Sequence, residues 1–219
     1  MVATMALNRA NLTPRDQDIL DALTLRVRVM SIRQIAGNWF GQTADPARHA
    51  ARRLSALAAA GLIEHHSMPA RPELLLAKPL VTWEPATEPP DFDNLAYTLE
   101  IRWKAPAVPT DIVIATRAAG NWMGGSGGRL PRRSEVSHDL TLARLYLTWR
   151  LRGQRAGRRW ISEATLRQEG LGDDDRLPDA IVEEGGRRCV IELGGAYSAS
   201  KLRDFHEFCL EHEWPYELW

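Results

Sequence analysis

Two short apolar stretches near the C-terminus decide the fold: RLPDAIV at residues 176–182 and RCVIELG at residues 188–194. Each has the aliphatic, β-branched composition of a strand, and the pair Gly185–Gly186 between them is a turn signal. The pattern therefore predicts a β-hairpin. Such a hairpin would hold the carboxylates of Asp179 and Glu192 side by side, which is the arrangement needed to share one hard divalent cation.

The two acids are spaced as in the PD-(D/E)xK nuclease pattern, in which a lysine two positions after the second acid activates the attacking water. Here that position is Gly194. The sequence is similar to a nuclease domain that has lost cleavage, and we expect no enzymatic activity. If a metal binds, Mg²⁺ is the expected ion, with Asp179 and Glu192 as its first ligands.

Two other residues complete this hypothetical site, and a simpler interpretation stays open beside it. Glu163 on the preceding strand is a third candidate ligand, and Lys201 on the next helix could supply the missing positive charge. Alternatively, the acids are remnants at strand ends that form ion pairs with arginines. The candidate arginines are Arg176, Arg187 and Arg188.

The N-terminal third contains three helix starts followed by two strands. A threonine cap and a proline begin the first helix at Thr13–Pro14, and a capping box, Ser31 with Gln34, begins the second. Asp45–Pro46 begins the third, which Gly61 ends. Strands at residues 62–64 and 74–76 would then form a hairpin. This order is typical of a winged helix-turn-helix, whose third helix enters the major groove of DNA.

Several polar residues on and near the third helix lie away from its apolar stripe. We expect them to contact DNA, together with one arginine in the hairpin loop; the alternative is that they only solvate a surface helix. The predicted contacts are Gln42, Thr43, Arg48, His49, Arg52, Arg53 and Arg71.

The middle of the chain carries weaker signals. Residues 78–104 are rich in proline and read as a linker with one short helix. Residues 112–115 could form a strand. Five glycines between Gly120 and Gly128 predict a mobile surface loop, because no Gly-Lys-Ser/Thr follows to make a phosphate-binding loop.

From residue 137 onward the predicted order is helix, three strands, helix and strand, which is the core order of the PD-(D/E)xK fold. The helix covers 140–149, the first strand 160–163, the second helix 200–211 and the last strand 216–219. The predicted architecture is therefore α+β with two domains. They are a winged helix-turn-helix over 1–77 and a restriction-endonuclease-like αβββαβ domain over 105–219, joined by the linker at 78–104.

Composition restricts the possible partners and the compartment. The net charge is zero, yet residues 161–219 hold 14 acidic and 6 basic side chains, so the basic groups concentrate in the first two thirds. A basic front suits a phosphate backbone. No apolar stretch approaches the roughly 20 residues that span a bilayer, and two isolated cysteines are typical of free thiols in a reducing cytoplasm. We therefore expect a cytoplasmic protein with no membrane contact.

The stretches SHDLTLARLYL, RRWISE, RLPDAIV and CVIELGGAYSASKL, behind a winged helix, resemble the replication-relaxation family of plasmids and integrative elements. The resemblance implies a DNA-binding accessory protein for replication or mobilisation, with a degenerate nuclease-like domain. Double-stranded DNA, a relaxase or replication protein, and a second copy in a homodimer are the expected partners. An active Mg²⁺-dependent endonuclease and a winged-helix transcriptional autoregulator are the two alternatives.

Overall fold

The computed structural model describes residues 12–152, 158–171 and 177–219 and shows a mixed α+β protein with two sheets. The chain forms two compact units that are not contiguous in sequence. The first combines the chain up to Ala70 with Ala107–Leu147, and the second combines Arg71–Pro106 with Thr148–Trp219. No helix of the described residues has the length and apolar character needed to cross a membrane.

The helices of the first unit begin where the sequence predicts. Thr13 and Asp16 form a capping box at the start of α1 (Pro14–Asp21), which continues into the π-helical turn η2 (Ala22–Arg26). Ser31 and Gln34 form a second capping box at the start of α2 (Ile32–Trp39). Asp45 caps α3 (Pro46–Ala59), and Gly61 follows that helix with a φ of 70°.

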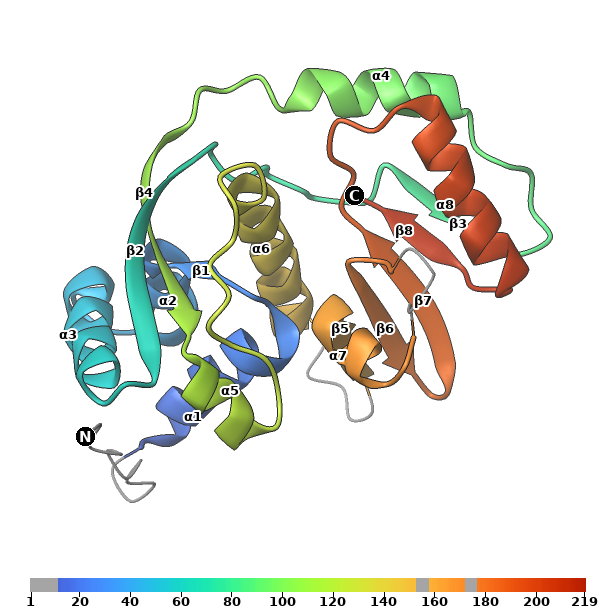
Figure 1. Ribbon diagram of the computed structural model, residues 1–219. Helices are drawn as coiled ribbons and strands as arrows, with labels where there is room; N and C mark the ends of the chain where they lie inside the picture. The colour runs from blue at the N-terminus through green and yellow to red at the C-terminus, as the bar shows by residue number, and fades with distance from the viewer. Residues whose placement is uncertain (1–11, 153–157, 172–176) are drawn as a thin grey trace. The chain divides into compact units, whose positions relative to one another are not determined.

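The sheet of the first unit corrects the predicted hairpin. Its strands are β1 (Met30–Ser31), β2 (Ile63–Ala70) and β4 (Val108–Ala115), all antiparallel in the order β1-β4-β2. The partner of β2 is therefore β4, and residues 74–76 form no strand (Figure 1). Residues 112–115 are buried and rich in β-branched side chains, whereas Leu75 is 81% exposed, so β4 stabilises the sheet far better.

The glycine-rich segment after β4 was also predicted incorrectly. Residues 117–123 form α5 (Arg117–Met123), and Gly125 and Gly127 after it pack closely against backbone instead of forming an open loop. A Cβ on Gly125 would lie 2.3 Å from the carbonyl oxygen of Thr24, and the Ser126 amide donates to that same oxygen at 2.8 Å. Gly125 is thus needed for close approach to η2.

The second unit is built on a five-stranded sheet in the order β3-β8-β7-β6-β5 (Figure 1). Strands β5, β6 and β7 are antiparallel neighbours, β8 is parallel to β7, and β3 is antiparallel to β8. Their bounds are Val81–Trp83 for β3, Arg158–Ser162 for β5, Ala180–Glu184 for β6, Arg187–Glu192 for β7 and Tyr216–Leu218 for β8.

Two helices stand at the predicted places in the chain order. Helix α6 (Val136–Arg152) begins in the first unit and precedes β5 in the chain, and α8 (Ala199–Glu211) follows β7 and precedes β8. The sequence analysis missed α7 (Glu163–Gln168), which follows β5.

The segment predicted to be a linker is part of the second unit. It supplies the edge strand β3 and the helix α4 (Phe92–Arg102). Trp83, Leu95 and Leu99 from this segment are 3%, 8% and 0% exposed in a core that also contains Ile181, Val190 and Phe205. The compact units consequently do not follow the predicted boundaries, because a stretch rich in proline still buries enough apolar surface to fold.

Candidate nucleic-acid interface and carboxylate pair

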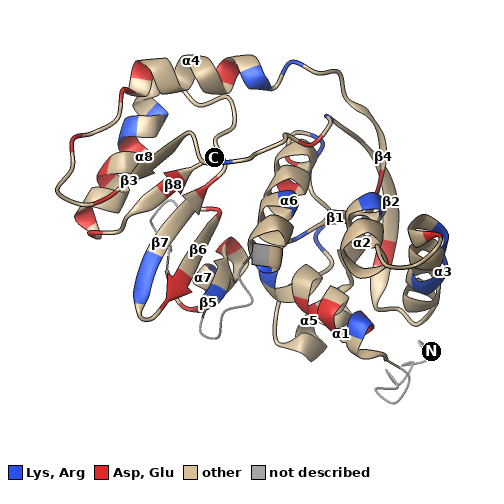
Figure 2. Cartoon of the chain, turned by 180° about the vertical axis from the view of Figure 1, so that it is seen from behind, with Lys and Arg blue, Asp and Glu red and all other residues tan. Residues whose placement is uncertain are grey.

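The outer face of α3 carries two arginines that the fold does not use. Arg48 and Arg52 are both exposed, and neither side chain has a hydrogen bond or ion pair with the described residues. The only carboxylate at the start of the helix, Asp45, accepts a hydrogen bond from the backbone amide of Arg48 at 3.1 Å. The arginine positions of α3 are blue in Figure 2. The two guanidinium groups are available for an anionic ligand.

Arg53 is engaged inside the protein, which corrects its assignment as a DNA contact. Its Nε donates to Asp16 Oδ1 at 2.7 Å and its Nη2 to Asp16 Oδ2 at 2.5 Å. Asp16 is fully buried. Burial alone would raise the pKa of this carboxyl, but hydrogen bonds from Arg53 and Thr13 outweigh that effect and lower the pKa. Arg53 therefore links α3 to the start of α1.

The remaining predicted DNA contacts differ in their availability. Gln42 is exposed in the turn before α3, and His49 is half-buried. Thr43 donates its hydroxyl to the Phe40 carbonyl at 2.7 Å, so it stabilises the end of α2. Arg71 follows β2 and belongs to the second compact unit, so the structure does not group it with α3. Arg33 on α2 is also exposed and has no partner among the described residues, but it lies off α3 and outside the predicted set of contacts.

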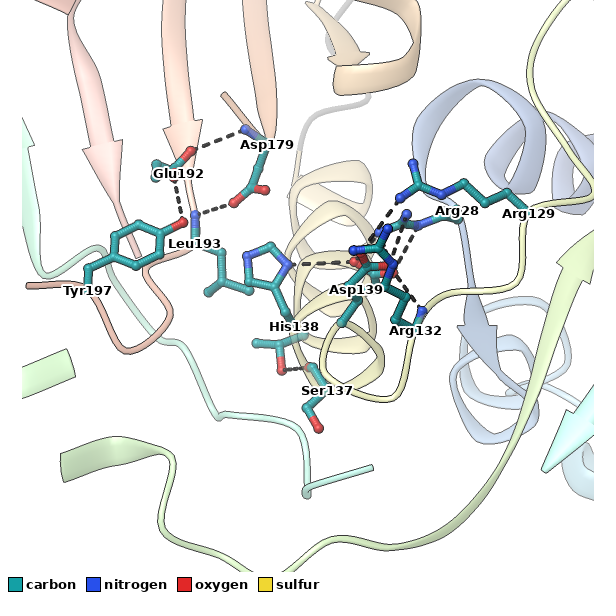
Figure 3. Close-up of polar contacts among 12 residues, drawn as sticks. Arg28, Arg129, Arg132, Ser137, His138, Asp139, Asp179, Glu192, Leu193 and Tyr197 are labelled. Atoms are coloured by element: carbon teal, nitrogen blue, oxygen red, sulfur yellow. Dashed lines mark hydrogen bonds and ion pairs between the residues drawn. The ribbon is translucent and has the colours of Figure 1, made fainter. Parts of the chain in front are cut away.

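The structure brings Asp179 and Glu192 together at one end of β6 and β7 (Figure 3). The Asp179 amide donates to Glu192 Oε2 at 3.2 Å, and the Leu193 amide donates to Asp179 Oδ2 at 2.8 Å. Tyr197 donates its hydroxyl to Glu192 Oε1 at 2.8 Å. Glu192 thus accepts the backbone amide of Asp179, and Asp179 accepts the amide of Leu193, the residue after Glu192. These two hydrogen bonds fix the ends of β6 and β7.

Glu163 does not join this pair. Its amide donates to the Asp179 carbonyl at 3.3 Å, so the backbones are adjacent. Ser162, however, caps α7 through the Thr165 amide, and Glu163 becomes the first residue of that helix. Its carboxylate accepts from Arg167 Nη2 at 2.8 Å. Within residues 12–152, 158–171 and 177–219, no group of three or more His, Cys, Asp or Glu side chains is arranged to hold a metal.

Lys201 approaches the pair through a tyrosine. Its Nζ lies 3.5 Å from the centre of the Tyr197 ring, whose hydroxyl donates to Glu192. Sequence reasoning missed Tyr197, because no spacing rule marks it. Of the arginines considered as partners of these acids, Arg188 donates to Glu183 at 3.2 Å, and Arg176 lies outside the described residues.

Gly194 stands where the motif lysine would be, and α4 fills the space above it. A Cβ there would lie 2.6 Å from Leu99 Cδ2 and 2.8 Å from Leu99 Cδ1. Arg102, at the end of α4, donates to the Gly194 carbonyl and, at 2.5 Å, to the Trp219 carbonyl. Burial lowers the pKa of Arg102 to about 10. The segment predicted as a linker therefore occupies the space beside Gly194, where the predicted motif would place its lysine.

A second polar cluster, also drawn in Figure 3, lies in the first unit at the start of α6. Arg28 donates to both carboxylate oxygens of the buried Asp139, at 3.0 and 2.9 Å, and lies 3.4 Å from Glu135. His138 Nδ1 is 3.6 Å from Asp139 Oδ1. The arginine satisfies the buried carboxylate, so this cluster holds the residues before β1 against α6.

Comparison with known protein families, with curated proteins and with solved structures found no match to this chain. The resemblance to the replication-relaxation family therefore stays a prediction. Two sets of residues remain as candidate functional groups: the exposed arginines of α3 and the carboxylate pair beside Tyr197 and Gly194.

Proposed function

We propose that the protein binds double-stranded DNA through α3 and serves as an accessory protein in the replication or mobilisation of a plasmid or integrative element. The pair Arg48 and Arg52, exposed and without partners among the described residues, is the observation that carries the proposal. The order α1-η2-β1-α2-α3-β2 supports a winged helix-turn-helix interpretation of the first unit, and β4 returns after β3 and α4 to complete a sheet ordered β1-β4-β2.

Fluorescence anisotropy with a labelled mixed-sequence duplex tests this proposal. The test variant is Arg48→Ala/Arg52→Ala, which leaves the Arg53–Asp16 pair intact, and Arg33→Ala on α2 is the matched control. We expect the double variant to lose at least about tenfold in affinity, since each arginine contact contributes about 1–3 kcal/mol. Equal affinity of the double variant and the wild type would end the proposal.

In the second unit, we propose a nuclease-like domain that stabilises the assembly without cleaving DNA. The order β5-α7-β6-β7-α8-β8, preceded in the chain by α6 and with β8 parallel to β7, supports the restriction-endonuclease-like interpretation. Three features argue against cleavage: both acids accept backbone amides, Glu163 pairs with Arg167, and Leu99 covers Gly194. The expected homodimer remains a proposal that a molar-mass measurement in solution can test.

An active Mg²⁺-dependent endonuclease is the second candidate, and one contact favours it. Lys201 lies over Tyr197, so a positive charge is linked to Glu192 even though the motif lysine is absent. The site fits a metal poorly, because Asp179 and Glu192 are the only acids among the described residues that converge there. We expect no nicking of supercoiled plasmid in Mg²⁺ or Mn²⁺. Cleavage that Glu192→Gln abolishes would establish the nuclease instead.

A further inference from the structure

Resting on the proposed DNA binding, we propose that Arg48 and Arg52 recognise two guanines in neighbouring base pairs of the major groove. The protein would then read base sequence, and its affinity would not come from the phosphate backbone alone. Arginine is the side chain best suited to guanine, because its guanidinium donates two hydrogen bonds to the O6 and N7 acceptors of that base.

The spacing of the two arginines sets the spacing of the bases. Arg48 and Arg52 are four residues apart on α3 (Pro46–Ala59), so they lie on the same face one above the other. Four residues rise about 6 Å along the axis of α3, and the axis of a helix that follows the major groove is inclined to the DNA axis. In that orientation, side chains three or four residues apart on one helix contact successive bases, so Arg48 and Arg52 reach neighbouring base pairs.

The chemistry of α3 leaves these two side chains free for bases. The sequence PARHAARRLSALAA contains no acidic residue that could compete for the guanidinium groups. The carboxylate just before it, Asp45, is engaged as the helix cap. Between the arginines, the exposed side chain of Ala51 is small enough to let the helix backbone approach the floor of the groove.

The helix that presents the arginines is held firmly from its inner face. Leu54 is fully buried and Leu57 is 1% exposed, while Arg53 is bound to the buried Asp16. Arg53 is next to Arg52 in sequence but is bound to Asp16, so Arg48 and Arg52 are the arginines of α3 that remain available as a pair among the described residues. Side chains on a fixed helix discriminate bases better than those on a loop, because their geometry is set before binding.

Selection from a duplex pool with a randomised centre tests this proposal. The wild type should enrich a motif with two guanines in neighbouring base pairs, on one strand or on opposite strands. Arg48→Ala should lose the preference at one position and Arg52→Ala at the other, each with an affinity loss of about 5- to 150-fold on the wild-type motif. The control Arg33→Ala should enrich the unchanged motif.

The outcomes separate this proposal from the DNA binding on which it rests. Pool binding without base preference, or identical motifs for the wild type, Arg48→Ala and Arg52→Ala, would overturn base recognition and leave DNA binding in place. No binding to any duplex would overturn both. An affinity loss on 7-deazaguanine, which lacks the N7 acceptor, at the two selected positions would independently support contact with guanine.

Discussion

Gly194→Ala should destabilise the second unit, because the added methyl group has no space. Its Cβ would lie 2.6 Å from a terminal carbon of Leu99, a side chain with no exposed surface. The backbone cannot move away easily: the Gly194 amide donates to the Trp219 carbonyl at 3.0 Å, and its carbonyl accepts from Arg102 and from Trp103 at 3.3 Å. Overpacking of this kind costs about 1–3 kcal/mol of unfolding free energy.

Urea denaturation followed by tryptophan fluorescence measures the effect. Gly37→Ala is the matched control, because Gly37 lies in α2 with nothing within 4 Å of an added Cβ. That change should be neutral or stabilise by about 0.5–1 kcal/mol, since alanine favours a helix. Adding Leu99→Ala to Gly194→Ala should cost less than the sum of the single changes, because the two side chains compete for the same space.

A Gly194→Ala protein as stable as the wild type would refute this account of the packing, and so would strict additivity with Leu99→Ala. The same geometry bears on activity. A lysine at position 194 would meet Leu99 at its Cβ, so Gly194→Lys should destabilise the protein and should not restore cleavage. A glycine at position 194 is therefore required by the packing of α4.

Three further predictions concern the interior. Arg53→Ala should lower the unfolding free energy by about 2–4 kcal/mol because it removes the one positive charge bound to the buried Asp16, whereas Arg52→Ala should not change it; thermal melting compares them. Burial lowers the pKa of His206, so only the unfolded state gains its proton as the pH falls below about 6.5; stability should decline there, and less so in His206→Gln. A fragment of residues 105–219 should show no cooperative melting by circular dichroism, because it lacks β3 and α4.

The sequence was most informative where structure depends on nearby residues. The capping boxes at Thr13 and Ser31 are local chemistry, and both helices begin where these residues predict. The hairpin around Gly185–Gly186 is local as well, and its register, with Ala180 opposite Ile191, brings Asp179 next to Glu192. Such features need only a few consecutive residues to be recognised.

Features that depend on distant residues could not be predicted in this way. The partner of β2 lies beyond an excursion of the chain that contributes β3 and α4 to the other unit. Composition favoured a linker there, since prolines are frequent and do not reveal that Leu99 will pack on Gly194. Arg53 looked like its neighbour Arg52, and only the buried Asp16, 37 positions away, distinguishes them.

Site-directed crosslinking tests the central claim, that α3 faces DNA, most directly. A photoreactive group on Ala51→Cys would be attached selectively, because Cys209 is fully buried and burial raises the pKa of the Cys189 thiol to about 12. Position 51 lies on the exposed face of α3, and Tyr97→Cys on the exposed face of α4 is the control. We expect the duplex to crosslink to position 51 and not to position 97. Adducts at position 97 with none at position 51 would contradict the account.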